Sequence, residues 1–309
     1  MDDPASVGIR FLLYLDLMLL FGLSMFGLYG LRGPERSNPS ILELRSGITM
    51  LAGLGIFLSA VALLLLAASM TGRPLAEVDA EALALLLSGT SAGAAWKVRI
   101  AVLAIAFLLP LLFWRRPLQA LTGTGAAGAI ALGTLAWTGH GAAGEGAAGW
   151  LQLIADIGHL FAAGIWVGAL WALSMLVFRR GMDLAHAELA RRALEDFSPV
   201  GSWAVVILVV TGLVNSWFLI GISNIGQMVS GPYGQLFAAK LVLFLAMLML
   251  AALNRFRLTP GAELAIRQRD IPAAAGALRC SLLAETSSAV LILALVAWLG
   301  MLSPPVAGP

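Results

Sequence analysis

The chain has 309 residues, of which 60% are hydrophobic and 12% are charged. Soluble domains carry roughly 45–50% apolar and about 25% charged residues, so this composition excludes a water-soluble fold. The formal net charge of +2 is too small, and too divided among the connectors, to indicate a nucleic-acid partner. The partner that the composition indicates is a lipid bilayer.

Apolar runs long enough to cross a membrane, which takes about 20 residues, recur along the whole chain. The alternating segments of about ten residues that mark a transmembrane barrel are not found. We therefore predict an all-α, polytopic integral membrane protein with a single membrane domain and a bundle of eight transmembrane helices. The predicted spans lie near residues 10–31, 46–70, 96–114, 118–138, 151–178, 200–221, 235–254 and 280–302.

Basic residues are divided unequally between the two sets of connectors. Fourteen of the nineteen Lys and Arg residues follow the first, third, fifth and seventh spans, and four lie on the alternate side. The positive-inside rule makes the arginine-rich connectors cytoplasmic and places both termini outside. The acidic start of the chain argues against a cleavable signal peptide. Residues 74–93 are too short and too acidic to cross, and they predict an amphipathic helix on the outer surface.

Two histidines fall near one level close to the outer boundary of the bilayer. Counting about 20 residues back from Arg179 reaches His159, and counting forward from Arg116 ends just before His140. The glycine-rich connector between them can act as a hairpin, so we expect the two rings to be adjacent. Asp156 shares a helical face with His159 and could orient it or join it as a ligand. The alternative is a buried structural His159 and an exposed loop His140.

The donor types favour copper among the metals that imidazole binds. Methionine thioethers select soft Cu(I), and Met70, Met228 and Met301 fall at or near the level of the histidines. Cys280 is the single cysteine, so no thiolate site is expected. A mixed site of histidine and methionine predicts a copper ion, as Cu(I). Packing between helices is the alternative role for each methionine.

Four further polar residues are expected inside the bilayer, where such groups are costly. Asp16 and Lys240 lie in the outer half and are expected to neutralise each other, or else to form part of a proton or ion path. Asn215 is expected to bond across helices. Glu285, in the inner half, is expected to pair with Arg255 or Arg279.

Several segments carry a specific family resemblance. These are IGHLFAAGIWVGALWAL, FSPVGSWAVVILVVTGLVNSW, YGQLFAAKLVLFLAMLMLAALNRFRLTP and LLAETSSAVLILALVAWLG. Residues 134–305 closely resemble the CopD/PcoD copper-resistance inner-membrane proteins, and the eight-span layout of the whole chain fits the same family. The resemblance implies a multi-pass protein of the bacterial inner membrane, so that the outer side predicted for both termini is the periplasm. It also implies copper contacts at His140 and His159, and a periplasmic copper-binding partner of the CopC type.

The function we expect is copper handling: copper binds on the periplasmic side and is transported across the membrane. A b-type haem redox protein, with one haem between the two histidines, is a second hypothesis. A scaffold that docks a periplasmic copper carrier is a third. Neither HExxH nor a phosphate-binding loop is found, so we expect a protein that is not an enzyme and any transport to be passive or gradient-driven.

Overall fold

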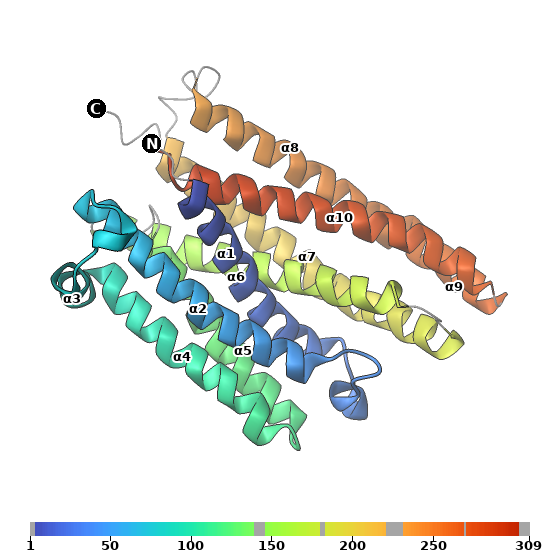
Figure 1. The fold of residues 1–309 in the computed structure, drawn as a ribbon. Helices are drawn as coiled ribbons and strands as arrows, with labels where there is room; N and C mark the ends of the chain where they lie inside the picture. The colour runs from blue at the N-terminus through green and yellow to red at the C-terminus, as the bar shows by residue number, and fades with distance from the viewer. Residues whose placement is uncertain (1–3, 139–145, 180–182, 221–230, 269, 303–309) are drawn as a thin grey trace.

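The computed structural model describes residues 4–138, 146–179, 183–220, 231–268 and 270–302. Within these ranges every regular element is helical (Figure 1). The α-helices are α1 (Pro4–Tyr29), α2 (Leu44–Thr71), α3 (Ala80–Gly89), α4 (Ser91–Phe113), α5 (Pro117–Gly133), α6 (Gly146–Val177), α7 (Leu184–Ile220), α8 (Pro232–Leu253), α9 (Thr259–Arg267) and α10 (Ile271–Leu299).

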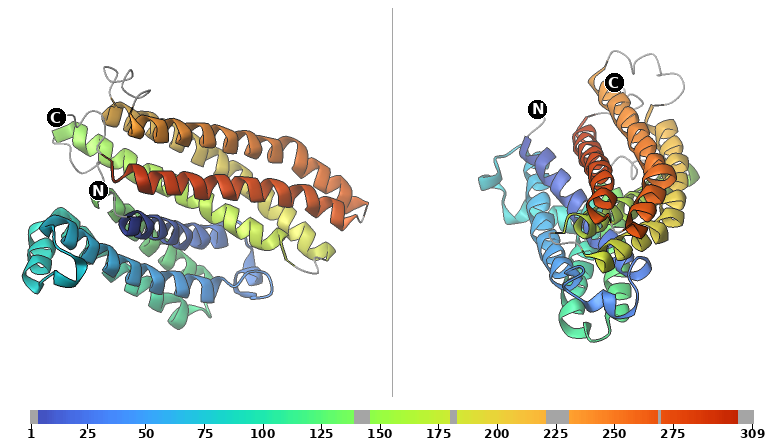
Figure 2. Two further views of the ribbon diagram at one scale, coloured as in Figure 1. Left: turned by 45° about the horizontal axis from the view of Figure 1, so that its top comes forward. Right: turned by 90° about the vertical axis from the view of Figure 1, so that its right-hand side faces the viewer.

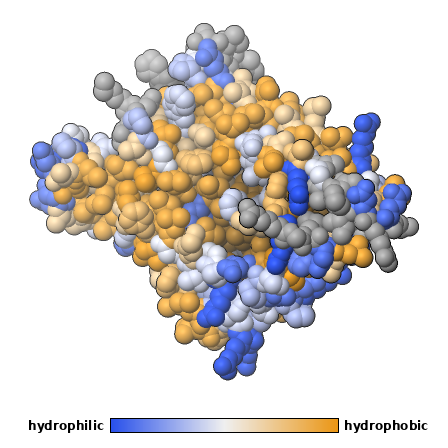
Figure 3. All heavy atoms as spheres, turned by 45° about the vertical axis from the view of Figure 1, so that its right-hand side comes forward, coloured by the Kyte–Doolittle hydropathy of each residue, from blue (hydrophilic) through white to orange (hydrophobic). Residues whose placement is uncertain are grey.

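The eight predicted spans are confirmed as helices. Eight helices of the described chain are long and apolar enough to cross a membrane: α1, α2, α4, α5, α6, α7, α8 and α10. Apolar side chains cover the middle of the molecular surface, and hydrophilic side chains gather toward its edges (Figure 3). An apolar girdle between polar ends is what a bilayer requires of a spanning bundle.

Local sequence signals set the ends of the helices between the second and third spans. Gly72 adopts a left-handed conformation at φ 66° and ends α2. The side chain of Asp79 accepts a hydrogen bond from the Ala82 N–H at 2.8 Å and begins α3. Thr90 accepts from the Gly93 N–H at 3.0 Å and begins α4. The short helix predicted between these spans is therefore formed, as α3.

Two helices begin well before the ends predicted from the charges. Helix α7 starts at Leu184 instead of near residue 200, and α10 starts at Ile271 instead of near 280. On α7, Arg191 pairs with Glu188 at 2.7 Å and also with Glu195. Such pairs three and four residues apart stabilise a helix in water. Charges therefore mark where a helix leaves the bilayer, and not where it ends.

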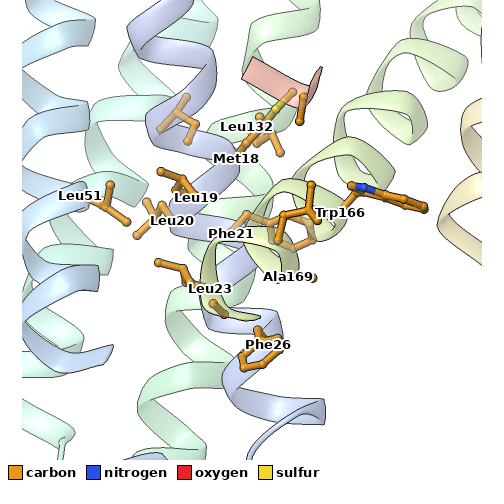
Figure 4. Packing of buried hydrophobic residues seen from close by; sticks show 14 of the residues in the cluster. Met18, Leu19, Leu20, Phe21, Leu23, Phe26, Leu51, Leu132, Trp166 and Ala169 are labelled. Carbon is orange, nitrogen blue, oxygen red and sulfur yellow. The ribbon is translucent and has the colours of Figure 1, made fainter. Parts of the chain in front are cut away.

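Helix α1 lies at the centre of the bundle and packs against α2, α5, α6 and α10 (Figures 1 and 2). Its buried side chains, including Leu20 and Phe26, meet residues of α2, α5 and α6 (Figure 4). The closest approach is between α1 and α6, where a Cβ atom on Gly22 or on Gly168 would overlap the backbone of the other helix. Small residues allow this proximity in membranes, where no hydrophobic effect drives helices together.

The two ends of the bundle differ in their charges. At one end the side chain of Arg10 donates to the carbonyl of Gly300 at 3.4 Å, so α1 begins where α10 finishes. We call this the termini end. At the other end Arg192 binds Glu35 at 2.7 Å and Arg32 binds Asp196 at 2.9 Å. We call this the arginine-rich end; its ion pairs join the first connector to α7.

Candidate metal site

His159 of α6 is held by a hydroxyl group of α7. Its Nδ1 lies 2.9 Å from the Oγ1 of Thr211, and Thr211 donates its own proton to the carbonyl of Ile207 at 2.6 Å. A hydroxyl has one proton to donate, so the Thr211 oxygen accepts from an N–H at Nδ1. A neutral imidazole protonated at Nδ1 has its lone pair at Nε2. The network therefore leaves Nε2 of His159 with a lone pair that can accept a hydrogen bond or bind a metal.

Asp156, one turn away on α6, is held by a different residue of α7. The amide of Asn215 donates to the Oδ1 of Asp156 at 2.6 Å, which forms the predicted bond across helices. The amide oxygen of Asn215 is buried and has no hydrogen-bond partner. Of the two roles predicted for Asp156, the orienting one is taken by Thr211, which bonds the Nδ1 of His159, and the role of a ligand stays a prediction. The carboxylate and the free amide oxygen stay available to a cation.

Lys240 of α8 completes the polar group. Its ammonium interacts electrostatically with the carboxylate of Asp156 and with the ring of His159. The group, which we call the outer cluster, therefore consists of Asp156, His159, Thr211, Asn215 and Lys240. It unites α6, α7 and α8 in one half of the bilayer. His159 lies 18 residues from Val177, the last residue of α6, which is about 27 Å along a helix and close to the thickness of the hydrocarbon core.

His140 lies outside the described residues, so its adjacency to His159 stays a prediction. The end of α5 does reach the level of His159, because a Cβ on Gly133 would contact Phe161 and Ile157 of α6 at 3.7–3.8 Å. Those two side chains and the imidazole leave α6 on opposite faces, since residues two apart on a helix do not share a face.

Two of the predicted methionine ligands lie in the described residues, both toward the termini end. Met70 is exposed near the end of α2, which packs against α1, α3 and α4, and the structure does not bring it to the outer cluster. Met301 follows α10 and is 38% exposed. Its neighbour Leu299 packs with Tyr233 and Phe237 at the start of α8, the helix that carries Lys240. Met228 lies outside the described residues.

The expected pair of Asp16 and Lys240 is not formed. Asp16 is 3% exposed, and its carboxylate lies against α2, where its Oδ2 is 2.7 Å from the Cβ position of Gly55. Neither oxygen has a hydrogen-bond partner. Lys240 interacts with Asp156 instead. The count of residues along each helix gave the depth of Asp16 and Lys240, but it gave no information about which helices are neighbours.

Glu285 is buried, and its partner is an amide instead of an arginine. The side chain of Asn254 donates to Glu285. Both predicted partners are bound elsewhere: Arg255 donates to the hydroxyl of Ser202 at 2.6 Å, and Arg279 donates to the carbonyl of Val177 at 2.9 Å. Asn254 is the first residue of a π-helical segment, Asn254–Leu258, that follows α8.

No cluster of three or more His, Cys, Asp or Glu side chains is present among the described residues. The described part of the site therefore offers one imidazole, one carboxylate and one amide oxygen. Thr211 is the member that sequence reasoning missed. The sequence could have identified it, because Thr211 and Asn215 are four residues apart and so share a helical face.

Comparisons with known proteins agree with the resemblance. A family model described as copper resistance protein D-like, N-terminal domain, matches residues 1–150, and one described as copper resistance protein D matches residues 191–299. The chain is 39% identical over 305 residues to copper resistance protein D of Pseudomonas syringae pv. tomato, which covers 98% of both chains.

Two more distant relatives have related names. Copper transport protein CutJ of Bacillus subtilis is 27% identical over 264 residues, which are 82% of this chain and 46% of that protein. Inner membrane protein YebZ of Escherichia coli is 25% identical over 258 residues, which are 82% of this chain and 84% of that protein. No solved structure was found to match. The chain is a multi-pass membrane protein that belongs to the copper resistance protein D family.

Proposed function

We propose that the protein binds copper, as Cu(I), at the outer cluster and moves it across the bacterial inner membrane. The observation that carries the proposal is the hydrogen bond between His159 Nδ1 and Thr211, which presents a lone pair at Nε2. Metal-binding histidines in proteins are commonly fixed in this way through their second nitrogen. No covalent step is required, so the protein is not an enzyme in this proposal.

The proposed orientation places the arginine-rich end in the cytoplasm and the outer cluster near the periplasm. A periplasmic copper-binding protein of the CopC type is then the donor. Met301 at the termini end is the first soft ligand that an incoming ion meets, and His140 supplies a second imidazole from the 139–145 connector. Family membership and the relatives named for copper resistance and copper transport support this assignment.

The test is metal binding to the purified protein in detergent. We expect wild type to bind Cu(I) or Ag(I), and His159→Ala to lose it. His186→Ala is the matched control, because His186 lies at the arginine-rich end and bonds to Asp183 at 2.6 Å. Unchanged stoichiometry in His159→Ala would remove His159 from the site. Soret absorbance in the purified protein would favour the haem hypothesis instead.

A further inference from the structure

A cavity of about 690 Å³ lies in the other half of the bundle, between α6, α7, the π-helical segment, α9 and α10. Its walls are mostly apolar and include Leu170, Leu248 and Leu282. Polar groups line it as well, among them Ser198 and Ser202 of α7. None of the described residues that line it is a His, Cys or Met, so this part of the chain offers no soft ligand for copper there. The cavity therefore calls for a different occupant.

Three buried polar side chains face this cavity. Glu285 is 3% exposed, Asn254 is 5% exposed and Trp166 is 4% exposed. The indole N–H of Trp166 has no hydrogen-bond partner. Pro199 also lines the cavity and has no N–H to bond the carbonyl of Glu195, four residues earlier on α7. A buried donor without a partner, beside the amide of Asn254 and the carboxyl of Glu285 in one roomy cavity, is the condition under which water is held.

The carboxyl of Glu285 has no cation beside it. Its bond is to the amide of Asn254, and no ion pair to Glu285 is formed within the described chain. A buried carboxylate without a counter-charge is costly in a membrane, so the group needs a proton or a cation. Among the described residues no group of three or more His, Cys, Asp or Glu side chains gathers around Glu285, as the hard-metal cage of six or more oxygens would require. A proton is the occupant that this site suits.

The charged groups around the cavity lie on its side toward the arginine-rich end. Helix α7 contributes Glu195, which pairs with Arg191. The π-helical segment contributes Arg255, bound to Ser202, and α9 contributes Glu263. Arg279 of α10 is bound to the carbonyl of Val177. Helices α1, α6 and α8 bring no charged side chain to this level of the bundle.

The cavity lies on the same helix faces as the outer cluster. Along α6, His159 is followed at helical spacing by Trp166 and Leu170. Along α8, Lys240 is followed in the same way by Leu248 and Arg255. Seven residues of α6, about 10 Å, separate His159 from Trp166. The two polar regions therefore lie on one axis, with the indole of Trp166 between them.

We propose that Glu285 is a proton-exchange site, reached through water in this cavity from the arginine-rich end, by which a pH gradient drives metal movement. Only the coupling of this proton exchange to metal movement rests on the proposed function. A proton binds Glu285 and leaves it through the cavity, and no bond other than the O–H bond forms or breaks. Because the chain has no ATPase motif, a gradient is the energy source that remains for uphill transport.

The first test asks whether water reaches the cavity, and it does not depend on transport. In a Cys280→Ser background, Ser202→Cys lines the cavity, and Val206→Cys on the exposed face of α7 is the control. A membrane-impermeant thiol reagent applied to inverted vesicles is expected to label Ser202→Cys and leave Val206→Cys unlabelled. Equal labelling of both, or labelling of neither, would overturn the proposal.

The second test asks whether Glu285 carries the proton. Infrared spectra of the purified protein, taken across a pH series, are expected to contain a C=O band of a protonated carboxyl group that Glu285→Gln lacks. Glu188→Gln, at an exposed carboxylate of α7, is expected to keep the band. Identical spectra for wild type and Glu285→Gln would refute the site.

The third test measures Ag(I) flux into proteoliposomes with and without a pH gradient. We expect the gradient to accelerate flux in wild type and not in Glu285→Gln, while both bind the same amount of Ag(I). Gradient-driven flux in Glu285→Gln equal to wild type would overturn the coupling. Absence of flux in wild type under either condition would instead count against transport as the proposed function, and the labelling and infrared results would still decide the proton site.

Discussion

The Nδ1 atom of His159 lies 2.9 Å from the hydroxyl oxygen of Thr211, across the contact between α6 and α7. Because Thr211 already donates to the carbonyl of Ile207, the bond sets the imidazole tautomer as well as the ring orientation. The position and protonation of one imidazole thus depend on a residue of the neighbouring helix. This hydrogen bond makes the tautomer of His159 depend on how α6 packs against α7.

Thr211→Val should weaken metal binding without removing the ligand. Valine keeps the shape of threonine but cannot accept the Nδ1 proton, so the ring loses its preferred tautomer. Loss of such a supporting bond commonly lowers metal affinity by roughly 10–100-fold. Titration with Cu(I) under competition from a chelator measures the change. Thr122→Val is the control, because Thr122 is an exposed threonine whose hydroxyl likewise bonds within its own helix. Equal affinities for Thr211→Val and wild type would contradict the assigned tautomer.

Lys240→Gln should bind Cu(I) more tightly than wild type. The ammonium of Lys240 repels a cation at His159 and competes with it for Asp156, so removal of that charge favours the metal-bound state. At the effective dielectric constant of a protein interior, the gain is roughly tenfold in affinity. Lys97→Gln, at an exposed lysine of α4, should leave the affinity unchanged. A weaker affinity in Lys240→Gln would show that Lys240 supports the bound ion instead of opposing it.

Much of the fold follows from the sequence, because the length and spacing of apolar runs determine which segments can cross a bilayer. All eight spans and the short helix α3 were predicted correctly. The helix ends were not, because Arg191 and its glutamate partners stabilise α7 outside the membrane. A charge marks the limit of the hydrocarbon core, and the helix itself continues until its hydrogen bonds or caps end it.

For the candidate site, the sequence predicted the depth of each residue in the bilayer but not which residues contact one another. His159, Asp156, Asn215 and Lys240 were all predicted at one level of the bilayer, and the structure brings them together in one half of the bundle. Asp16 was placed at a similar depth and faces Gly55 of α2 instead. Counting residues along a helix gives the depth of a side chain in the bilayer. The residues that it contacts depend on how the helices are arranged around α1. That arrangement depends on backbone contacts between small residues, which hydropathy does not show.

Gly22→Ala should destabilise the contact between α1 and α6. A Cβ at Gly22 would overlap the backbone of Gly164 and Gly168, so the helices would have to move apart. Overpacking of this kind costs about 1–3 kcal/mol. Thermal unfolding of the purified protein in detergent is the measurement. Gly47→Ala is the control, since the Cβ position of Gly47 on α2 has open space around it. Equal melting temperatures for the two variants would mean that α1 and α6 are not held at this distance.

Glu35→Gln should reduce stability at neutral pH and have no effect in acid. Partial burial of Glu35 opposes its ionisation, but hydrogen bonds from the Arg192 side chain and the Arg32 backbone outweigh this, and the pKa of Glu35 falls below its ordinary 4.5. The unfolded chain therefore takes up this proton at a higher pH than the folded chain. The pair stabilises the folded protein above about pH 4.5, and this contribution is lost as the pH falls through the folded pKa.

The expected difference in unfolding free energy between wild type and Glu35→Gln is about 1 kcal/mol at pH 7, since the pair is partly exposed. Melting temperatures at pH 7 and at pH 3 measure it, and the gap should narrow at the lower value. Glu81→Gln, at an exposed position of α3, should show the same melting temperature as wild type at pH 7. A gap for Glu35→Gln that is constant with pH would mean that the bond to Arg192 does not depend on the charge of the carboxylate, and that the first connector is joined to α7 by contacts other than this ion pair.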